Sequence, residues 1–74
     1  MLTLIQRDDC ALCDDAWEIL HQAGVSNFDS LFIDGDKELE LCFGHLVPVL
    51  RLQHSLLPWP FTVEQVRVWL KALE

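Results

Sequence analysis

The spacing of hydrophobic residues changes from strand-like to helix-like at Cys10, and this change limits the possible folds more than any other feature. Segment 2–5 is a short β-prone run that stops at Arg7-Asp8-Asp9. From Cys10 onward the apolar residues recur at helical spacing, at Leu12, Ala16, Ile19, Leu20 and Ala23. Gly24 stands where a glycine commonly ends a helix, and segment 28–33 is a second predicted strand. The chain therefore begins as a β–α–β unit, which requires a parallel strand pair and a right-handed crossover.

The middle of the chain predicts a short helix and then two strands. Asp36 can cap the helix and Gly44 is its expected end, with an apolar stripe at Leu39, Cys42 and Phe43. The strands predicted over 47–52 and 55–57 are joined by Gln53-His54. So tight a connection requires an antiparallel pair.

The last predicted element is a helix that starts at Thr62, because Thr62-Val63-Glu64-Gln65 fits a capping box. Its apolar stripe consists of Val63, Val66, Leu70 and Leu73. We therefore predict an α/β fold of order βαβ-α-ββα, with one mixed four-stranded sheet and helices on both faces. A single domain over residues 1–74 accounts for the whole chain.

The charge and the composition exclude several functions. The formal net charge is −7, with twelve acidic residues against five lysines and arginines, which argues against nucleic-acid binding because phosphate binding needs a cationic face. The same charge favours neutral or basic partners. No apolar run approaches the length of a membrane span, and the first segment is too short for a signal peptide. We expect a cytoplasmic monomer that acts without a membrane.

Cys10 and Cys13 are the residues whose chemistry the sequence indicates most directly. The chain has three cysteines, an odd number, and no secretory signal, so redox or metal chemistry is favoured over a disulfide framework. At the start of a helix, unpaired backbone N–H groups and the helix dipole favour a thiolate at the first cysteine. We therefore predict that Cys10 is the nucleophile and that Cys13 resolves the mixed disulfide. The alternative is that Cys10 and Cys13 are simply two small apolar residues that lie three positions apart by chance and have no redox role.

Three motifs together resemble the glutaredoxin branch of the thioredoxin superfamily, and more narrowly a group of small bacterial glutaredoxin-like proteins. They are Cys10-Ala11-Leu12-Cys13, Val47-Pro48-Val49 and Trp59-Pro60-Phe61, and the match covers nearly the whole chain. The resemblance implies a thioredoxin-like, glutaredoxin-type fold. It also implies a thiol–disulfide oxidoreductase that reduces protein or glutathione mixed disulfides.

The resemblance also implies roles for residues outside the dithiol. Pro48 would be a cis-proline that faces the dithiol, and the backbone of Val47 would pair with a bound peptide or glutathione. Arg7 would support the thiolate and the carboxylate of glutathione. No bound cofactor is expected, and glutathione is a candidate co-substrate, although Ala11-Leu12 replaces the Pro-Tyr of typical glutaredoxins. The substrate would be a protein disulfide or a low-molecular-weight one.

The residues around the last helix start have two interpretations. Trp59-Pro60-Phe61 is most simply a packing segment, since aromatic residues dominate small cores. In the functional interpretation Trp59 forms a wall of the substrate groove, and the helix start at Thr62 offers N–H groups to a substrate carboxylate. In that case the chain could also be a thioredoxin-fold adaptor that binds a partner near Trp59 and carries a vestigial dithiol. Trp17 and Trp69 are expected to pack on helix faces.

Two further features bear on the dithiol. Asp8, Asp9, Asp14 and Asp15 flank the cysteines; they support the helix dipole, or they disfavour the thiolate by like charge. Cys42 and His45, taken with Cys10 and Cys13, form a zinc-like ligand set. Against zinc, Cys42 fits the apolar stripe of its helix and is expected to be buried. We predict no metal site.

Overall fold

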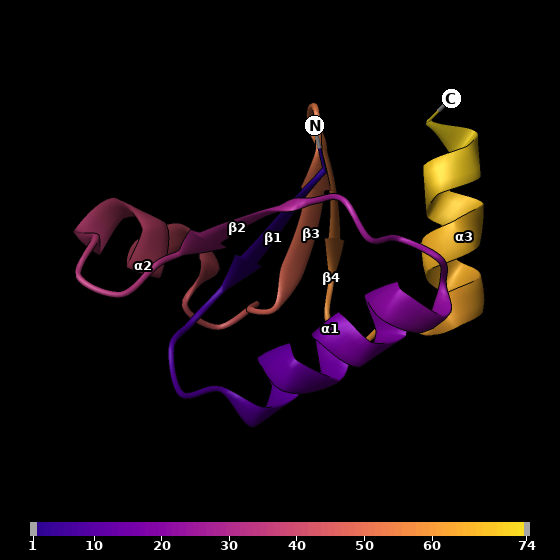
Figure 1. Ribbon diagram of the computed structural model, residues 1–74. Coiled ribbons are helices and arrows are strands. Elements are labelled where there is room, and N and C mark those ends of the chain that lie inside the picture. The colour runs from indigo at the N-terminus through magenta and orange to yellow at the C-terminus, as the bar shows by residue number, and fades with distance from the viewer. Residues whose placement is uncertain (1, 74) are drawn as a thin grey trace.

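The computed structural model describes residues 2–73 of the chain. Its strands and helices occur in the predicted order (Figure 1). They are β1 (Thr3–Gln6), α1 (Ala11–Gln22), β2 (Asp29–Phe32), α2 (Lys37–Phe43), β3 (Val49–Leu52), β4 (Ser55–Pro58) and α3 (Val63–Ala72). The predicted bounds agree with these to within two residues.

The strands form one four-stranded sheet in the order β2-β1-β3-β4. β1 pairs in parallel with β2, from Thr3 opposite Asp29 to Gln6 opposite Phe32. The β1–β3 and β3–β4 pairs are antiparallel. The mixed four-stranded sheet predicted from the sequence is therefore confirmed. β1 ends at Gln6, and a short loop connects it to Cys10 at the start of α1.

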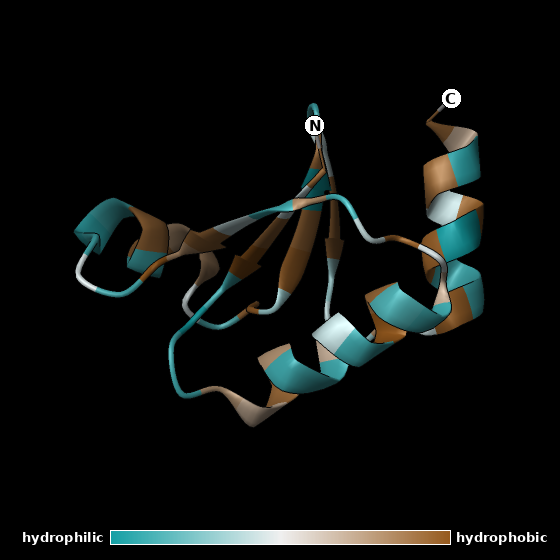
Figure 2. Ribbon diagram, viewed as in Figure 1, coloured by the Kyte–Doolittle hydropathy of each residue, from teal (hydrophilic) through white to brown (hydrophobic). Residues whose placement is uncertain are grey.

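Each face of the sheet has its own apolar core, because neighbouring strand residues point to opposite faces. Leu4 and its strand partner Leu50 contribute to the core beneath α1 and α3, which also contains Ala16, Leu20 and Val66. Ile5 and its partner Val49 belong to the opposite core, against which Leu39 and Phe43 of α2 pack. In Figure 2 the strands are largely brown, whereas each helix alternates between brown and teal. The prediction of helices on both faces is thus correct.

The helix ends follow local chemistry. The Thr62 hydroxyl accepts from the Gln65 backbone N–H at 3.1 Å, and the Gln65 side chain accepts in return from the Thr62 N–H at 2.8 Å, which confirms the capping box. Gly24 follows α1 with φ +82°, a left-handed conformation that suits glycine. Gly44 differs, because it ends α2 with an ordinary φ of −54°. Its lack of a side chain matters for space instead, since a methyl group there would run into the Glu40 carbonyl.

The segment before β3 corrects one predicted bound. The strand starts at Val49 and not at Val47, because Pro48 has no N–H to contribute to the ladder. The Val47–Pro48 and Trp59–Pro60 peptide bonds are both cis. The Pro48 carbonyl accepts from the Trp59 N–H at 3.0 Å and so joins the two segments. Within residues 2–73, no helix combines the length and the apolar character needed to cross a membrane.

Candidate active site

Cys10 occupies the N-cap position of α1, immediately after the loop that leaves β1. Its backbone is extended, with φ −126° and ψ 109°, and its Sγ accepts a hydrogen bond from the Cys13 backbone N–H at 3.1 Å. The two cysteines are joined as a disulfide, with their Cα atoms 5.2 Å apart. The N-cap placement directs the Cys13 backbone N–H at Cys10 Sγ, which is an arrangement that stabilises a thiolate after reduction.

The two cysteines differ in their accessibility. Cys13 is 2% exposed, because its side chain lies on the buried face of α1. Cys10 is partly exposed at the end of the helix. A substrate disulfide can therefore reach Cys10 Sγ, whereas Cys13 is placed to react with a group already bonded to Cys10.

The loop before Cys10 is held by its own aspartates. Asp9 adopts a left-handed conformation with φ +52°, which aspartate tolerates better than most residues. The Asp9 N–H donates to Asp8 Oδ1 at 3.1 Å, and the Asp8 N–H donates to Asp34 Oδ2 at 2.7 Å. The bond to Asp34 ties the loop to the turn that follows β2, and the bond between Asp9 and Asp8 closes the loop on itself just before Cys10.

Arg7 connects the same loop to α2. Its Nη1 lies 2.6 Å from Glu40 Oε1 in an ion pair, and its Nη2 donates to the Gly44 carbonyl at 3.3 Å. The guanidinium is therefore engaged with α2. Its role toward the thiolate and a glutathione carboxylate, which the resemblance implies, stays a prediction.

A pocket of about 360 Å³ surrounds the dithiol. It is lined by Gln6, Arg7, Asp8, Asp9, Cys10, Ala11, Cys13, Asp14, Trp17 and Phe32. Three of the four aspartates that flank the cysteines thus face the pocket, and Asp15 does not contribute to it. The pocket that contains Cys10 and Cys13 is therefore lined by three acidic residues and one arginine.

Gln6 is a site residue that the sequence analysis did not identify. It is the last residue of β1 and is 4% exposed. Its Oε1 accepts a hydrogen bond from Trp17 Nε1 at 3.1 Å, but its Nε2 is buried without an acceptor within residues 2–73. Two residues beyond Leu4 in the strand, Gln6 shares the face covered by α1. The sequence did offer a signal for Gln6, because this strand position is buried and would ordinarily carry an apolar residue.

Trp17 also belongs to the site, although only helix packing was predicted for it. Its side chain is 46% exposed and lines the dithiol pocket. Its ring packs against Phe28 with the ring centroids 4.8 Å apart. Trp17 therefore combines an anchored ring with an exposed apolar edge beside the sulfurs.

The remaining predicted binding residues lie outside the lining of this pocket. Pro48 is fully buried, and Val47 packs in the core beneath α2. Trp59 packs in the core beneath α1 and α3, and its ring lies against Phe61 with centroids 4.9 Å apart. The proposed contacts of Val47, Pro48 and Trp59 with substrate stay predictions.

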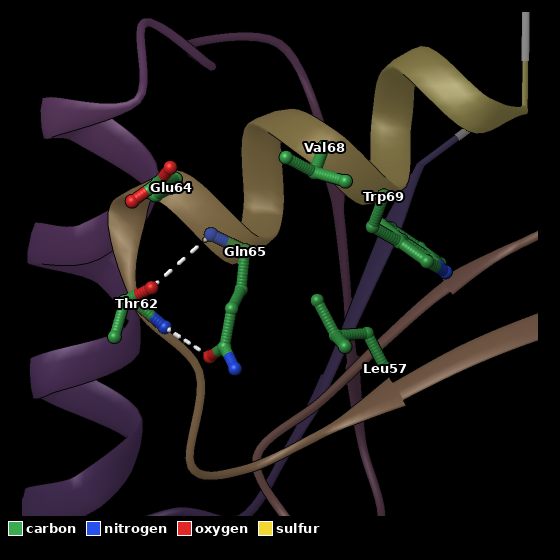
Figure 3. Close-up of a pocket in the computed structure, with 6 residues that line it drawn as sticks. All are labelled: Leu57, Thr62, Glu64, Gln65, Val68 and Trp69. Carbon is green, nitrogen blue, oxygen red and sulfur yellow. Dashed lines mark hydrogen bonds between the residues drawn. The ribbon is translucent and has the colours of Figure 1, made fainter.

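Thr62 lines a different pocket of about 660 Å³, between α3 and β4. Its other lining residues are Leu57, Glu64, Gln65, Val68 and Trp69 (Figure 3). It shares no lining residue with the dithiol pocket. In Figure 3 the Thr62 hydroxyl and backbone are engaged with Gln65. A substrate-binding role for Thr62 therefore stays a prediction that the geometry does not connect to the dithiol.

The zinc alternative has no support in the geometry. Cys42 is exposed, so the expectation that it is buried in the apolar stripe was wrong. The reason is that Leu39 and Phe43, four residues apart, already provide the face of α2 that packs on the sheet. Within the described part of the chain, no three histidine, cysteine, aspartate or glutamate side chains converge on one point as metal ligands would.

The comparisons with known proteins agree with this geometry. The model of the glutaredoxin-like domain family (DUF836) matches residues 1–71. The chain belongs to this family. No curated protein matches the sequence of this glutaredoxin-like domain.

Two solved structures are similar to this glutaredoxin-like domain. The X-ray structure of Northeast Structural Genomics target protein XcR50 from X. campestris is 52% identical, with 97% of each chain covered and a TM-score of 0.93. The solution structure of the same target is 53% identical, covers 96% of this chain and 92% of that chain, and has a TM-score of 0.90. These similarities support the thioredoxin-like fold over nearly the whole chain.

Proposed function

We propose that this glutaredoxin-like domain is a thiol–disulfide oxidoreductase that reduces protein or glutathione mixed disulfides through Cys10 and Cys13. One observation carries the proposal: the two cysteines are joined as a disulfide at the start of α1, with one of them accessible and the other buried. Family membership supports the same chemistry.

The reaction proceeds in two exchanges. The Cys10 thiolate attacks one sulfur of the substrate disulfide, and the other substrate sulfur leaves as a thiolate that takes a proton from solvent. The Cys13 thiol then loses its proton and attacks Cys10 Sγ, which releases the second substrate thiol and forms the Cys10–Cys13 disulfide. Two electrons pass to the substrate, and an external thiol then reduces the Cys10–Cys13 disulfide back to the dithiol. The hydrogen bond from the Cys13 N–H to Cys10 Sγ stabilises the attacking thiolate.

The proposal includes the setting in which the reaction takes place. It assigns the protein to the cytoplasm as a monomer, with glutathione as a candidate co-substrate and no tightly bound cofactor. A reducing compartment suits a dithiol that must return to the thiol form.

The test is made in a Cys42→Ser background, because Cys42 is exposed and would otherwise form disulfides of its own. Cys10→Ser should abolish disulfide reduction. Cys13→Ser should retain the first exchange and accumulate a mixed disulfide detectable by mass spectrometry. Equal alkylation rates of the two thiols at neutral pH would contradict the asymmetric roles. A protein without a reversible two-electron couple in a redox buffer would instead fit the adaptor with a vestigial dithiol.

A further inference from the structure

The charges that line the dithiol pocket are strongly unbalanced. Asp8, Asp9 and Asp14 all line the pocket with Cys10 and Cys13. Within residues 2–73, none of these three carboxylates takes part in an ion pair. Asp34 adds a fourth negative charge nearby, because its carboxylate accepts from the Asp8 N–H at 2.7 Å.

The one cation in the pocket lining does not correct this imbalance. Arg7 forms its ion pair with Glu40 at 2.6 Å and donates its other nitrogen to the Gly44 carbonyl. The charge of the guanidinium is therefore matched by a carboxylate outside the pocket. The net charge of the whole chain, −7, has the same sign as the pocket and extends its effect to longer range.

We infer that the dithiol selects disulfides with cationic groups next to the sulfurs and disfavours anionic ones, among them glutathione disulfide. This inference rests on the proposed function and narrows its substrate class to cationic disulfides, such as cystines flanked by lysine or arginine in a polypeptide. An ammonium group near the attacked sulfur is attracted by the three pocket carboxylates, whereas the carboxylates of glutathione are repelled. The exposed edge of Trp17 offers an apolar contact and a ring face beside them.

The size of the preference follows from the charges. A single charge about 7 Å from a carboxylate in a water-like medium gains or loses about a factor of three in affinity. Three carboxylates at somewhat larger and unequal distances give about a fivefold preference for a cationic over a neutral disulfide. An anionic disulfide should lose about the same factor. Exposed charges are screened, so both factors should approach one at about 1 M salt, where the Debye length is about 3 Å.

The experiment measures single-turnover oxidation of the pre-reduced Cys42→Ser protein by three disulfides of similar size. They are cystamine, which carries ammonium groups, hydroxyethyl disulfide, which is neutral, and dithiodipropionate, which carries carboxylates. Each rate constant is divided by that of dithiothreitol with the same disulfide, because leaving-group basicity alone changes exchange rates. We expect cystamine to exceed hydroxyethyl disulfide, and hydroxyethyl disulfide to exceed dithiodipropionate, each by about fivefold at low salt.

Two double variants with the same change in net charge separate the pocket from the rest of the chain. Asp8→Asn with Asp14→Asn removes two charges from the pocket lining and should reduce each preference to within about twofold. Asp29→Asn with Glu64→Gln removes two charges outside the lining, at the start of β2 and in the first turn of α3, and should leave most of the preference. Glu40→Gln leaves the charge of Arg7 unpaired, which should accelerate dithiodipropionate and slow cystamine, each by about threefold.

The outcomes distinguish this inference from the proposed function. Equal rates for all three disulfides in the parent protein would overturn the inference and leave the oxidoreductase in place. An equal loss of preference in both double variants would also overturn it, because the net charge and not the pocket would then be responsible. Failure to reduce even hydroxyethyl disulfide would reject the proposed function itself, and with it the inference.

Discussion

Replacing Gln6 with methionine should make the protein more stable, although Gln6 is almost fully buried. The parent side chain has one hydrogen bond, from Trp17 Nε1 to Oε1, and a buried Nε2 without an acceptor in the described residues. Removing an unsatisfied buried donor relieves about 1–3 kcal/mol, and losing the hydrogen bond costs about 1 kcal/mol. Trp17 is 46% exposed, so we expect water to replace Gln6 as the acceptor for its indole N–H. Methionine has a similar length and flexibility and fills the same space.

The expected net result is a gain of about 1 kcal/mol in the free energy of unfolding, which raises Tm by about 4–8 °C in a domain of this size. Urea unfolding of the oxidised protein, followed by far-ultraviolet circular dichroism, measures the gain directly. Gln22→Met is the matched control, because Gln22 is exposed on α1 and its replacement should change stability by less than about 0.5 kcal/mol. A Gln6→Met protein less stable than the parent would refute the reasoning. It would mean that the Gln6 amide is satisfied in solution.

Three further substitutions test the fold and the loop that carries Cys10. Leu4→Ala removes a fully buried side chain from the core beneath α1 and should lower the free energy of unfolding by about 3 kcal/mol in the same urea assay. Thr62→Ala breaks the capping box with Gln65 and should cost about 1 kcal/mol; an unchanged midpoint would mean that α3 does not depend on its cap. Glu40→Gln removes an exposed ion pair with Arg7 and should cost less than about 1 kcal/mol, with the difference from the parent vanishing at high salt.

The order of the elements was predictable because each one carries its own local signal. Successive residues in the apolar stripe of α1 are at most four positions apart. The cap at Asp36 and the capping box at Thr62 each join residues three positions apart. The mixed sheet followed from the lengths of the connections, since a long crossover and a tight turn allow different pairings. The position of Cys10 at the start of α1 was predictable for the same reason, because the sequence changes there from strand spacing to helix spacing.

The surroundings of the dithiol depend on contacts between distant residues, and these were not predictable. Arg7 pairs with Glu40, which is 33 positions away, and the Asp8 N–H is bound by Asp34. The hydrogen bond between Gln6 and Trp17 also depends on how α1 crosses β1. Cys42 was misplaced because a seven-residue helix exposes most of its surface, and a stripe of three residues does not show which of them reach the sheet.

The weak anchoring of α2 has a dynamic consequence. None of its residues is fully buried, and only Leu39 and Phe43 pack against the sheet core. An element with so few buried contacts opens at a lower free energy than the whole domain, and amide hydrogen exchange detects such openings as a separate, faster class. Each opening of α2 also releases Glu40 and the Gly44 carbonyl from Arg7. The local stability of one short helix thus determines how long the Arg7 guanidinium, in the lining of the dithiol pocket, stays paired with Glu40.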